Sequence, residues 1–391
     1  MNNEWLTTHH SSLITHHMIA IVADDFTGAA ELAGISLRYG LKTELFTSKP
    51  TATNADVVII STDSRSLNKA AALQITEDVL KNVLELKPSF IYKKIDSVLR
   101  GYVLDELKLQ MQLMQKAKAF ILPANPSLGR TISKGNYYVQ GKLISETGFA
   151  ADPEFPISDS SVQAILKDET VQVLKHTDGL ASNGIVVGEA ENETDVQAWA
   201  DKLDGSFVLA GAGDFYTALL NKQFKQAKQQ QAELQFPFLY VCGTAYDQSV
   251  NYIKQVDEKN KTVLYISKQM IENGTGDTTW LQQCNDVLKQ KQKAIIAFNR
   301  EAIPDDASAA DLRSIMAQAV KAIVDQNKIS ELFIEGGSTA TAILQELGIN
   351  HLSLVNELKR GVVRMKAAEL FITVKPGSYE LPNEIKQLFT I

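Results

Sequence analysis

The stretch MIAIVADDFTGAA at residues 18–30 decides the fold class of this chain. Its run 19–23 is continuously apolar, as in a strand of a parallel sheet that is covered on both faces. Two aspartates follow, and a helical apolar pattern then extends over 29–39. Similar apolar runs return at 57–60, 90–92, 120–122, 185–187 and 207–210, with helical patterns such as 70–86 and 104–115 between them. This alternation predicts an α/β fold with largely parallel sheets.

A polar stretch, KQFKQAKQQQAELQ at 222–235, interrupts the alternation, and we interpret it as a linker. Beyond it the strand pattern resumes at 238–242, 263–266, 294–298, 332–334 and 371–374. The sequence therefore predicts two α/β lobes, 18–221 and 236–391. We expect a ligand cleft between them, because open α/β sheets bind ligands beyond the carboxyl ends of their strands.

The composition limits the class of ligand. The chain has 391 residues, 45% of them hydrophobic, and a formal charge of −7 without a long basic run. This excludes a disordered chain and argues against a nucleic-acid or membrane surface, so we expect a small-molecule ligand. No apolar run is long enough to span a bilayer, and the two cysteines, Cys242 and Cys284, lie in apolar segments. A cytoplasmic protein is expected, and an oligomer is compatible with the sequence.

Residues 1–17 are polar and contain four of the six histidines, His9, His10, His16 and His17. These two adjacent pairs could bind a metal ion, but no periodic pattern surrounds them to fix their rings. We therefore expect a disordered N-terminal tail, with the fold beginning at Met18.

Polar side chains follow the first two predicted strands. Asp24 and Asp25 follow the first strand directly, and paired carboxylates there suit the binding of a polyol, the binding of a metal ion or the removal of a hydroxyl proton. The alternative is that Asp25 or Thr27 caps the following helix, which accounts for one acidic residue and not for two. Arg65 follows the second strand. Its planar guanidinium matches a carboxylate, and a surface ion pair is the alternative.

The third and fourth strands also end in polar segments, KKIDSVLRG at 93–101 and PANPSLGRT at 123–131. Such a density of charged side chains is hard to explain as packing, although a solvated loop is the alternative. Cations here could bind the acid group of a substrate or neutralise a transferring phosphate. The candidates in these two segments are Lys94, Asp96, Ser97, Arg100 and Arg130.

The second lobe carries two glycine turns, EGGSTATA at 335–342 and KPGSY at 375–379. The first opens a helix, so its backbone N–H groups suit a phosphate, although neither turn is a Walker loop or a dinucleotide fingerprint. AGAGDF at 210–215 resembles the motif of ribokinase-like sugar kinases, but the Asp-Thr pair that usually precedes that motif is missing. We interpret its Asp214 as a helix cap.

The chain resembles the four-carbon acid sugar kinase family in six motifs and in their order. These are ADDFTGA at 23–29, STDSR at 61–65, KKIDSVLRG at 93–101, PANPSLGR at 123–130, EGGSTA at 335–340 and KPGS at 375–378. Members of the family phosphorylate the terminal hydroxyl of threonate, erythronate or 3-oxo-tetronate with ATP. The resemblance implies an ATP-dependent kinase that uses Mg²⁺. It makes 18–221 the substrate-binding domain and 236–391 the nucleotide-binding domain.

The resemblance and the strand ends together nominate site residues. The candidates for binding the sugar acid are Asp24, Asp25, Arg65, Lys94, Ile95, Asp96, Ser97 and Arg130. The candidates for binding the nucleotide are Thr244, Gly336, Gly337, Ser338, Thr339 and Gly377. Asp25 is the first candidate for the general base and Asp96 the second, with Lys94 and Arg100 as candidates for charge stabilisation. No residue is nominated as a metal ligand.

Two segments depart from the family pattern. The Gly-Ser-x-Ser opening of the second lobe reads Gly-Thr-Ala-Tyr at 243–246, and the Asn-Phe-Gly after the last glycine reads Ser-Tyr-Glu at 378–380. Two alternatives stay open. One is a ribokinase-like sugar kinase that uses Asp214. The other, which the departures favour, is a two-lobe metabolite sensor that binds without turnover.

Overall fold

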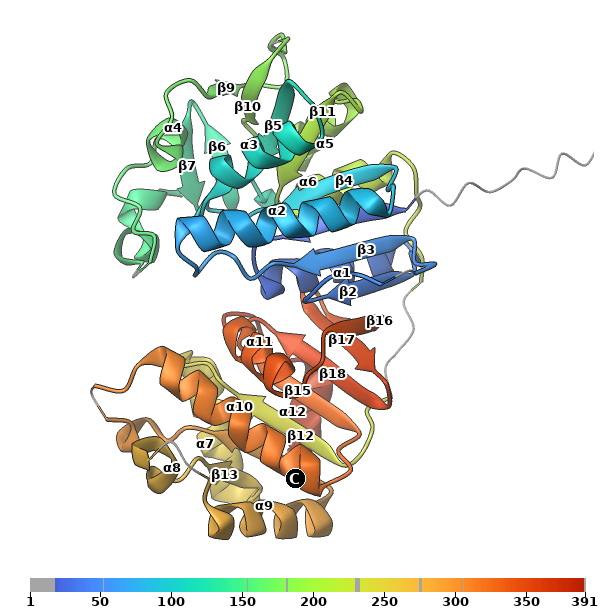
Figure 1. Cartoon of the computed structure of the whole chain (residues 1–391). Coiled ribbons are helices and arrows are strands. Elements are labelled where there is room, and N and C mark those ends of the chain that lie inside the picture. The colour runs from blue at the N-terminus through green and yellow to red at the C-terminus, as the bar shows by residue number, and fades with distance from the viewer. Residues whose placement is uncertain are drawn as a thin grey trace, which may run out of the picture.

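The computed structural model describes residues 18–51, 53–152, 154–180, 182–228, 233–273, 276–304 and 306–389, so the predicted tail 1–17 lies outside it. The two lobes are stacked in Figure 1, the first in blue to green and the second mostly in yellow to red. Within the described ranges one sheet of 15 strands runs through both lobes.

The strand order places the carboxyl-terminal strands in the middle of this sheet. The second lobe contributes β13 (Val263–Tyr265), β14 (Lys293–Ala297), β12 (Phe238–Cys242), β15 (Glu331–Glu335), β18 (Leu370–Lys375), β17 (Val362–Ala367) and β16 (His351–Lys359). The first lobe continues with β2 (Thr43–Phe46), β3 (Val57–Ser61), β1 (Ile19–Ala23), β4 (Phe90–Lys94), β11 (Phe207–Gly211), β5 (Lys118–Leu122), β10 (Gly184–Gly188) and β9 (Gln172–Leu174). Neighbouring strands are parallel except where β16 or β17 takes part, which confirms the predicted α/β class with largely parallel strands.

Helices cover both faces of the sheet. The first lobe has α1 (Phe26–Arg38), α2 (Lys69–Glu85), α3 (Val103–Leu113), α4 (Val162–Leu166), α5 (Glu193–Lys202) and α6 (Gly213–Asn221). The second lobe has α7 (Asp247–Asn260), α8 (Lys268–Asn273), α9 (Thr278–Lys291), α10 (Ala309–Gln326), α11 (Gly337–Glu346) and α12 (Asn383–Phe389). A small sheet of β6 (Arg130–Ser133), β7 (Asn136–Val139) and β8 (Lys142–Leu143) lies beside the first lobe. Because of this double cover, every residue of β1 and β3 is buried.

The register brings the predicted polar segments to one edge. Ala23, the last residue of β1, pairs with Ser61 of β3 and with Lys94 of β4. Lys94 pairs with Gly211, which in turn pairs with Leu122 of β5. The residues that follow these strands therefore leave the sheet side by side, as expected for parallel strands.

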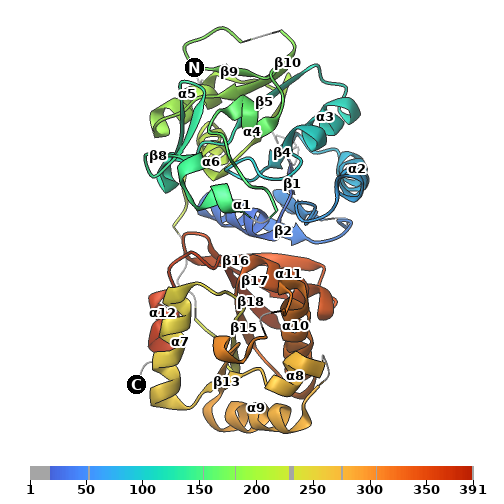
Figure 2. The same ribbon diagram turned by 90° about the vertical axis from the view of Figure 1, so that its left-hand side faces the viewer.

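The two lobes share the sheet because β2 pairs with β16 in antiparallel register, with Leu45 opposite Leu352. The sequence pattern predicted neither strand: β2 is short, and β16 is irregular, with a buried Asn356 and shifts of register. Figures 1 and 2 both show α1 and β2 facing β16 and β17 across the junction. Arg38 of α1 fastens this junction with two hydrogen bonds to Glu357, at 2.8 and 3.0 Å.

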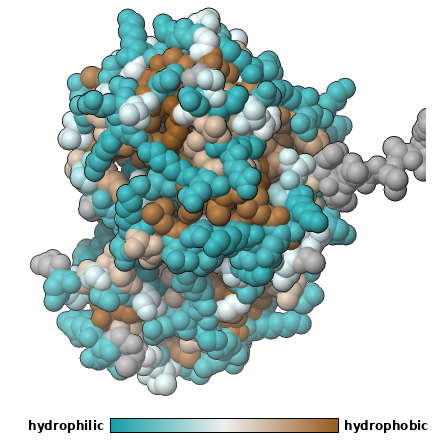
Figure 3. Space-filling model, turned by 45° about the horizontal axis from the view of Figure 1, so that its top comes forward, coloured by the Kyte–Doolittle hydropathy of each residue, from teal (hydrophilic) through white to brown (hydrophobic). Residues whose placement is uncertain are grey.

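Figure 3 shows mostly hydrophilic side chains on the face that it displays, with apolar patches between them. Among the helices of the described ranges, none is long and apolar enough to cross a membrane.

Candidate active site

Three carboxylates that follow β1 and β4 surround one arginine. Arg65 donates from Nε and Nη2 to the two oxygens of Asp24, both at 3.0 Å. Its Nη1 lies 3.0 Å from Asp25 Oδ2 and 3.6 Å from Asp96 Oδ1. Burial alone would lower the pKa of Arg65, but the three carboxylates outweigh burial and raise it. Arg65 is therefore a permanent cation that links the two aspartates after β1 to the segment after β4.

Asp25 has two tasks in this arrangement. Its Oδ1 accepts a hydrogen bond of 2.7 Å from the backbone N–H of Gly28 and so caps α1. Its Oδ2 faces Arg65. The side chain of Asp25 is 23% exposed and that of Asp24 is 7% exposed. Capping and function are thus compatible, and Asp25 is the more accessible carboxylate of the pair.

Asp96 is fixed by a second arginine. Arg100 donates from Nε and Nη2 to its two oxygens, both at 3.0 Å, and the backbone N–H groups of Val98 and Arg100 donate to Oδ2. Burial alone would raise the pKa of Asp96, but Arg65 and then Arg100 outweigh it and hold the pKa below the ordinary range. Asp96 is therefore a firmly ionised and weakly basic group. Arg100 also donates to Asp152 at 2.8 Å.

Lys94 adds a buried cation beside Asp25. Its Nζ donates to the carbonyl of Ile95 at 2.8 Å and lies 3.5 Å from Glu31 Oε2 of α1. A side chain on Gly28 would approach this Nζ, so the ammonium lies against the start of α1. We call Asp24, Asp25, Arg65, Lys94, Asp96 and Arg100 the strand-end cluster.

Arg130 reaches this cluster from the loop after β5. It donates to the hydroxyl of Ser97, and its guanidinium lies 6.0 Å from the ring centre of Phe149. Tyr137 fixes the same serine from the other side, because its hydroxyl donates to the carbonyl of Ser97 at 2.6 Å. The predicted residues of the first lobe are thus brought together around one point.

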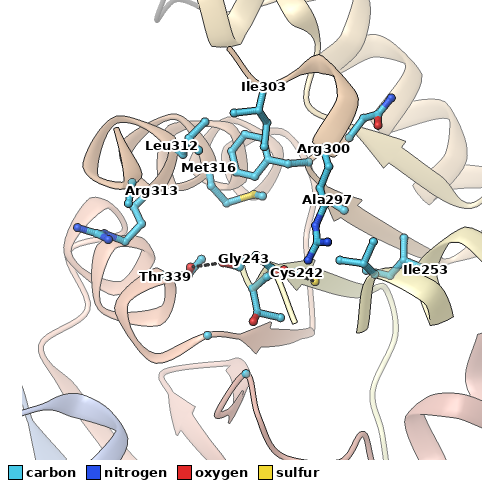
Figure 4. Close-up of a pocket in the computed structure, with 18 of the residues that line it drawn as sticks. Cys242, Gly243, Ile253, Ala297, Arg300, Ile303, Leu312, Arg313, Met316 and Thr339 are labelled. Carbon is cyan, nitrogen blue, oxygen red and sulfur yellow. Dashed lines mark hydrogen bonds between the residues drawn. The ribbon is translucent and has the colours of Figure 1, made fainter. Parts of the chain in front are cut away.

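The second lobe contains a cavity of about 410 Å³ at the carboxyl ends of β12, β14 and β15. Figure 4 shows Ile303, Leu312 and Met316 gathered on one side of it and Gly243 and Thr339 on the other. Among the described residues that line it there is no Asp or Glu. An apolar wall with glycines opposite suits a flat base joined to an anionic group. We call this space the second-lobe cavity.

Three cations line the second-lobe cavity: Lys254, Arg300 and Arg313. Arg300 forms an exposed ion pair of 3.0 Å with Asp247, and Figure 4 shows its side chain reaching toward Cys242. Within the described part of the chain neither Lys254 nor Arg313 has a hydrogen bond or ion pair, so both are available to an anion. The described lining contributes cations and no carboxylate, which makes it electrostatically suited to a polyphosphate.

The glycine turn before α11 forms one end of this cavity. Gly336 has a φ of +111°, a conformation that residues with a side chain rarely adopt. α11 begins without a side-chain cap, so its first backbone N–H groups have no capping partner. A side chain on Gly243 would collide with Thr339, so the strand end of β12 packs directly on this turn.

The two sites meet at the starts of two helices. A side chain on Gly337 would collide with Oγ1 of Thr27, which lies in the first turn of α1, two residues after Asp25. The glycine turn of the second lobe therefore touches the helix that Asp25 caps. This contact places the strand-end cluster next to the end of the second-lobe cavity that suits phosphate.

The second predicted glycine loop, 375–379, is held from inside the protein. Lys375 is fully buried, pairs with Glu335 at 2.8 Å, and donates to the carbonyls of Pro376 and Tyr379 at 2.9 and 2.5 Å. Gly377 lines the second-lobe cavity and packs on Thr244. Because Lys375 contacts main-chain atoms, this loop keeps its shape with the sequence Ser-Tyr-Glu.

The nucleotide candidates Thr244, Gly336, Gly337, Ser338, Thr339 and Gly377 all line the second-lobe cavity. Tyr246 is not among the residues that line it and is 43% exposed. Sequence reasoning missed the apolar wall and the cations Lys254, Arg300 and Arg313. Lys254 lies in α7 and Arg313 in α10, helices whose apolar positions read as ordinary core, so no motif distinguished these cations.

The interpretation of Asp214 as a helix cap is wrong. The cap of α6 is Ala212, without a side-chain hydrogen bond. The carboxylate of Asp214 instead accepts from the backbone N–H and the hydroxyl of Ser127, at 2.9 and 2.7 Å, and from Arg360 at 3.2 Å. Asp214 therefore links the loop after β5 to the second lobe.

Comparisons with known proteins also assign different ligands to the two lobes. The family described as a sugar-binding N-terminal domain matches residues 19–219, and the family described as a nucleotide-binding C-terminal domain matches 216–379. A D-threonate kinase of Salmonella typhimurium is 26% identical, over 86% of this chain and 88% of that protein. A 3-oxo-tetronate kinase of Brucella melitensis is 23% identical, over 92% of each chain. A solved structure from Salmonella typhimurium, described as a putative tRNA synthase, has a TM-score of 0.78 at 20% identity and covers 95% of this chain and 98% of that one.

The fold and the two sites define a two-domain protein that pairs a sugar-binding domain with a nucleotide-binding domain. The chain belongs to the four-carbon acid sugar kinase family. The predicted family is thereby confirmed, and so is the predicted class of enzyme, a kinase that phosphorylates an alcohol group of a sugar acid.

Proposed function

We propose that the chain transfers the γ-phosphoryl group of ATP to the terminal hydroxyl of a four-carbon sugar acid. The contact between Thr27 and Gly337 carries this proposal, because it joins the strand-end cluster to the phosphate end of the second-lobe cavity. The adenine base lies against the apolar wall of that cavity, and the phosphates lie along the turn 336–339.

The sugar acid binds over the strand-end cluster. Arg65 and Arg100 are already committed to aspartates, so the carboxylate of the substrate is bound by Arg130, which retains unused N–H groups. Asp24 and Asp25, held in place by Arg65, accept hydrogen bonds from the hydroxyl groups. Ile95 and Ser97 complete the site through the backbone and the hydroxyl. The acid group is therefore recognised at the rim of the cluster by Arg130, and the hydroxyl groups are recognised at its centre by Asp24 and Asp25.

Asp25 is the general base of the proposed reaction. It takes the proton of the terminal hydroxyl, whose oxygen forms a bond to the γ-phosphorus as the bond from that phosphorus to the β-phosphate bridging oxygen breaks. Asp96 is less suited to this task, because its lowered pKa and its two bonds to Arg100 make it a weak base. Lys94, beside the start of α1, stabilises the charge of the transferring group.

Mg²⁺ fits this site as a partner of the nucleotide. No group of three or more His, Cys, Asp or Glu side chains in the described ranges is arranged to hold a metal ion. A kinase cation that takes most of its ligands from phosphates and water needs one or two carboxylates. Desolvation and the negative charges of Asp25 and Asp24 raise the pKa of Asp63, which lies near the strand-end cluster. Asp63 would hold Mg²⁺, which would neutralise phosphate charge.

We also infer a cytoplasmic location. Cys242 and Cys284 are free and buried. Burial raises the pKa of each thiol to about 12, so both stay protonated near neutral pH. Two unpaired thiols are compatible with a reducing compartment.

A coupled assay of ADP release tests the proposed function. The full chain with Mg²⁺ and ATP is supplied with D-threonate, D-erythronate or 3-oxo-tetronate, and mass spectrometry identifies the phosphorylated product. We expect ADP release that depends on one of these acids. Saturable binding of an acid without ADP release would favour the metabolite sensor, and ADP release with a neutral sugar alone would favour the ribokinase-like kinase.

A further inference from the structure

Asp214 is almost enclosed, although the proposed reaction leaves it without a task. Its side chain is 10% exposed, and both of its oxygens accept hydrogen bonds from Ser127. Its own backbone N–H donates to Oδ1 of Asn125 at 2.9 Å. The start of α6 is therefore fastened at three points to the loop 123–130.

The third partner residue of Asp214 comes from the other lobe. Arg360 lies in the turn between β16 and β17, and its Nη2 lies 3.2 Å from Asp214 Oδ1 and 2.5 Å from the hydroxyl of Ser127. The same turn is fixed by Glu357, which accepts from the backbone N–H of Gly361 at 2.6 Å. We call Asp214, Ser127 and Arg360 the inter-lobe clamp.

The inter-lobe clamp touches elements of both ligand sites. On the side of the first lobe, its loop ends in Arg130, which donates to Ser97. On the side of the second lobe, Tyr379 packs on Gly361, and Tyr379 closes the loop whose Gly377 lines the second-lobe cavity. Continuous contacts therefore run from this cavity to the candidate ligand of the acid group.

We propose that Asp214 is a positioning residue whose bonds to Ser127 and Arg360 hold Arg130 over the sugar-acid site. The proposal rests on the proposed function for the identity of the ligand. Within the described residues Asp214 has no hydrogen bond or ion pair with the strand-end cluster, so its carboxylate is not placed to take a proton from a substrate bound there. An Asp that ties together a helix start, a loop and a second lobe instead sets the position of that loop.

The exposed position of Arg360 limits how much the loop 123–130 should change when this side chain is removed. Its side chain is 47% exposed, and an exposed ion pair by itself contributes little. Its bonds, however, end on a buried carboxylate and on the hydroxyl that this carboxylate binds. We therefore expect a measurable loss of order in the loop, and not unfolding of the chain.

The first experiment measures hydrogen exchange of peptides from 123–131 in the full chain without ligands. Arg360→Ala should speed exchange of this loop, which lies in the other lobe, by about tenfold, as expected for losing a hydrogen bond to a charged group. Lys359→Ala is the matched control, since Lys359 lies next to Arg360 but pairs with Glu380 in its own lobe. Equal exchange in wild type and Arg360→Ala would overturn the clamp. This readout needs no substrate, so it stands even if no tetronate is phosphorylated.

The second experiment measures KM and kcat with the acid that the wild type phosphorylates. Arg360→Ala and Asp214→Asn should each raise the KM for the acid, by about tenfold for a charged hydrogen bond, with kcat changed much less. Arg360→Lys should recover part of the loss. The double variant should be no worse than Asp214→Asn, because both changes break one cluster. Loss of kcat by orders of magnitude in Asp214→Asn, with Arg360→Ala normal, would make Asp214 the base and overturn the positioning role.

Discussion

In the first lobe, the charged side chains of the strand-end cluster are paired with one another, and Arg65 alone contacts three carboxylates. In the second lobe, the cavity is lined by apolar side chains and glycines, and its cations Lys254 and Arg313 have no hydrogen bond or ion pair within the described residues. A paired cluster keeps its geometry before the substrate arrives, as electrostatic stabilisation of a transition state requires. These two cations are available to form hydrogen bonds with an anion when it binds. The comparison teaches that the first lobe orients the reacting groups and that the second lobe binds the nucleotide.

The largest effect is expected on kcat when the proposed general base of the first lobe, Asp25, is changed. Asp25→Asn keeps the cap of α1, since Asn is as good a cap as Asp, but removes the charge and the basicity. We expect kcat to fall by roughly 10² to 10⁴, the usual contribution of a general base, with a much smaller change in KM for the acid. Steady-state kinetics of a folded variant measures this. A normal kcat would show that Asp25 does not take part in the chemical step, and would contradict the assignment of that step to the first lobe.

The second prediction breaks the pairing of the strand-end cluster. Arg65→Met leaves buried carboxylates without their cation, so the free energy of unfolding at pH 7 should fall by about 3–5 kcal/mol. Arg65 lowers the pKa of Asp96 in the folded chain. Its stabilisation is therefore present above the ordinary pKa of Asp and is lost as the pH falls below it.

Urea unfolding at pH 7 and near pH 4 checks this prediction. The difference between wild type and Arg65→Met should shrink toward the lower pH, because Asp96 becomes protonated more readily without Arg65. Lys81→Met, which removes a surface ion pair with Glu77, serves as the control and should change stability little. A pH-independent difference would mean that packing, and not charge, makes Arg65 important.

The third prediction concerns the contact where the two regions meet. Gly337→Ala should favour α11 by helix propensity, yet its methyl group would collide with Thr27. We expect kcat/KM to fall at least about tenfold for both substrates, as a methyl group that displaces the reacting groups can cost more. Thr27→Ala in the same chain removes the colliding hydroxyl and should restore part of the activity. A loss confined to ATP would show that Gly337 serves the nucleotide alone.

The smallest effect is expected at the rim of the second-lobe cavity. Arg313→Met removes a cation that has no hydrogen bond or ion pair within the described ranges, so KM for ATP should rise about tenfold while KM for the acid stays unchanged. Lys321→Met on the same helix is the control, because Lys321 pairs with Asp325 away from the cavity. An equal rise in both KM values would mean that Arg313 serves both ligands, and would contradict its assignment to the nucleotide alone.

The predictable parts of this molecule are those with a local signature. The buried strands of the parallel sheet were found because each is a short apolar run, and the strand-end cluster was found because Asp24, Asp25 and Arg65 follow such runs directly. The joining strands β2 and β16 were missed, since a polar, irregular strand such as β16 has no strict period. The shared sheet depends on this one pairing.

Only those parts of the site that have a local sequence signature were predictable. Glycine turns that contribute backbone atoms were visible, because Gly336 and Gly337 stand together between an apolar run and a helical pattern. The apolar wall was not visible, because Leu312 and Met316 occupy the positions of ordinary core residues on α10. Asp214 was misread because its partners Ser127 and Arg360 are distant in sequence. Only the three-dimensional contacts distinguish a cap from a link between lobes.

Hydrogen exchange with one ligand at a time tests the division between the lobes most directly. The full chain is compared without ligand, with MgADP alone, and with the acid that it phosphorylates alone. MgADP should protect peptides from 243–254, 297–303 and 309–316, which contain lining residues of the second-lobe cavity, and the acid should protect peptides from 24–28 and 94–100. Protection of the strand-end cluster by MgADP alone, together with protection of the second-lobe cavity by the acid alone, would contradict the assignment of the two lobes.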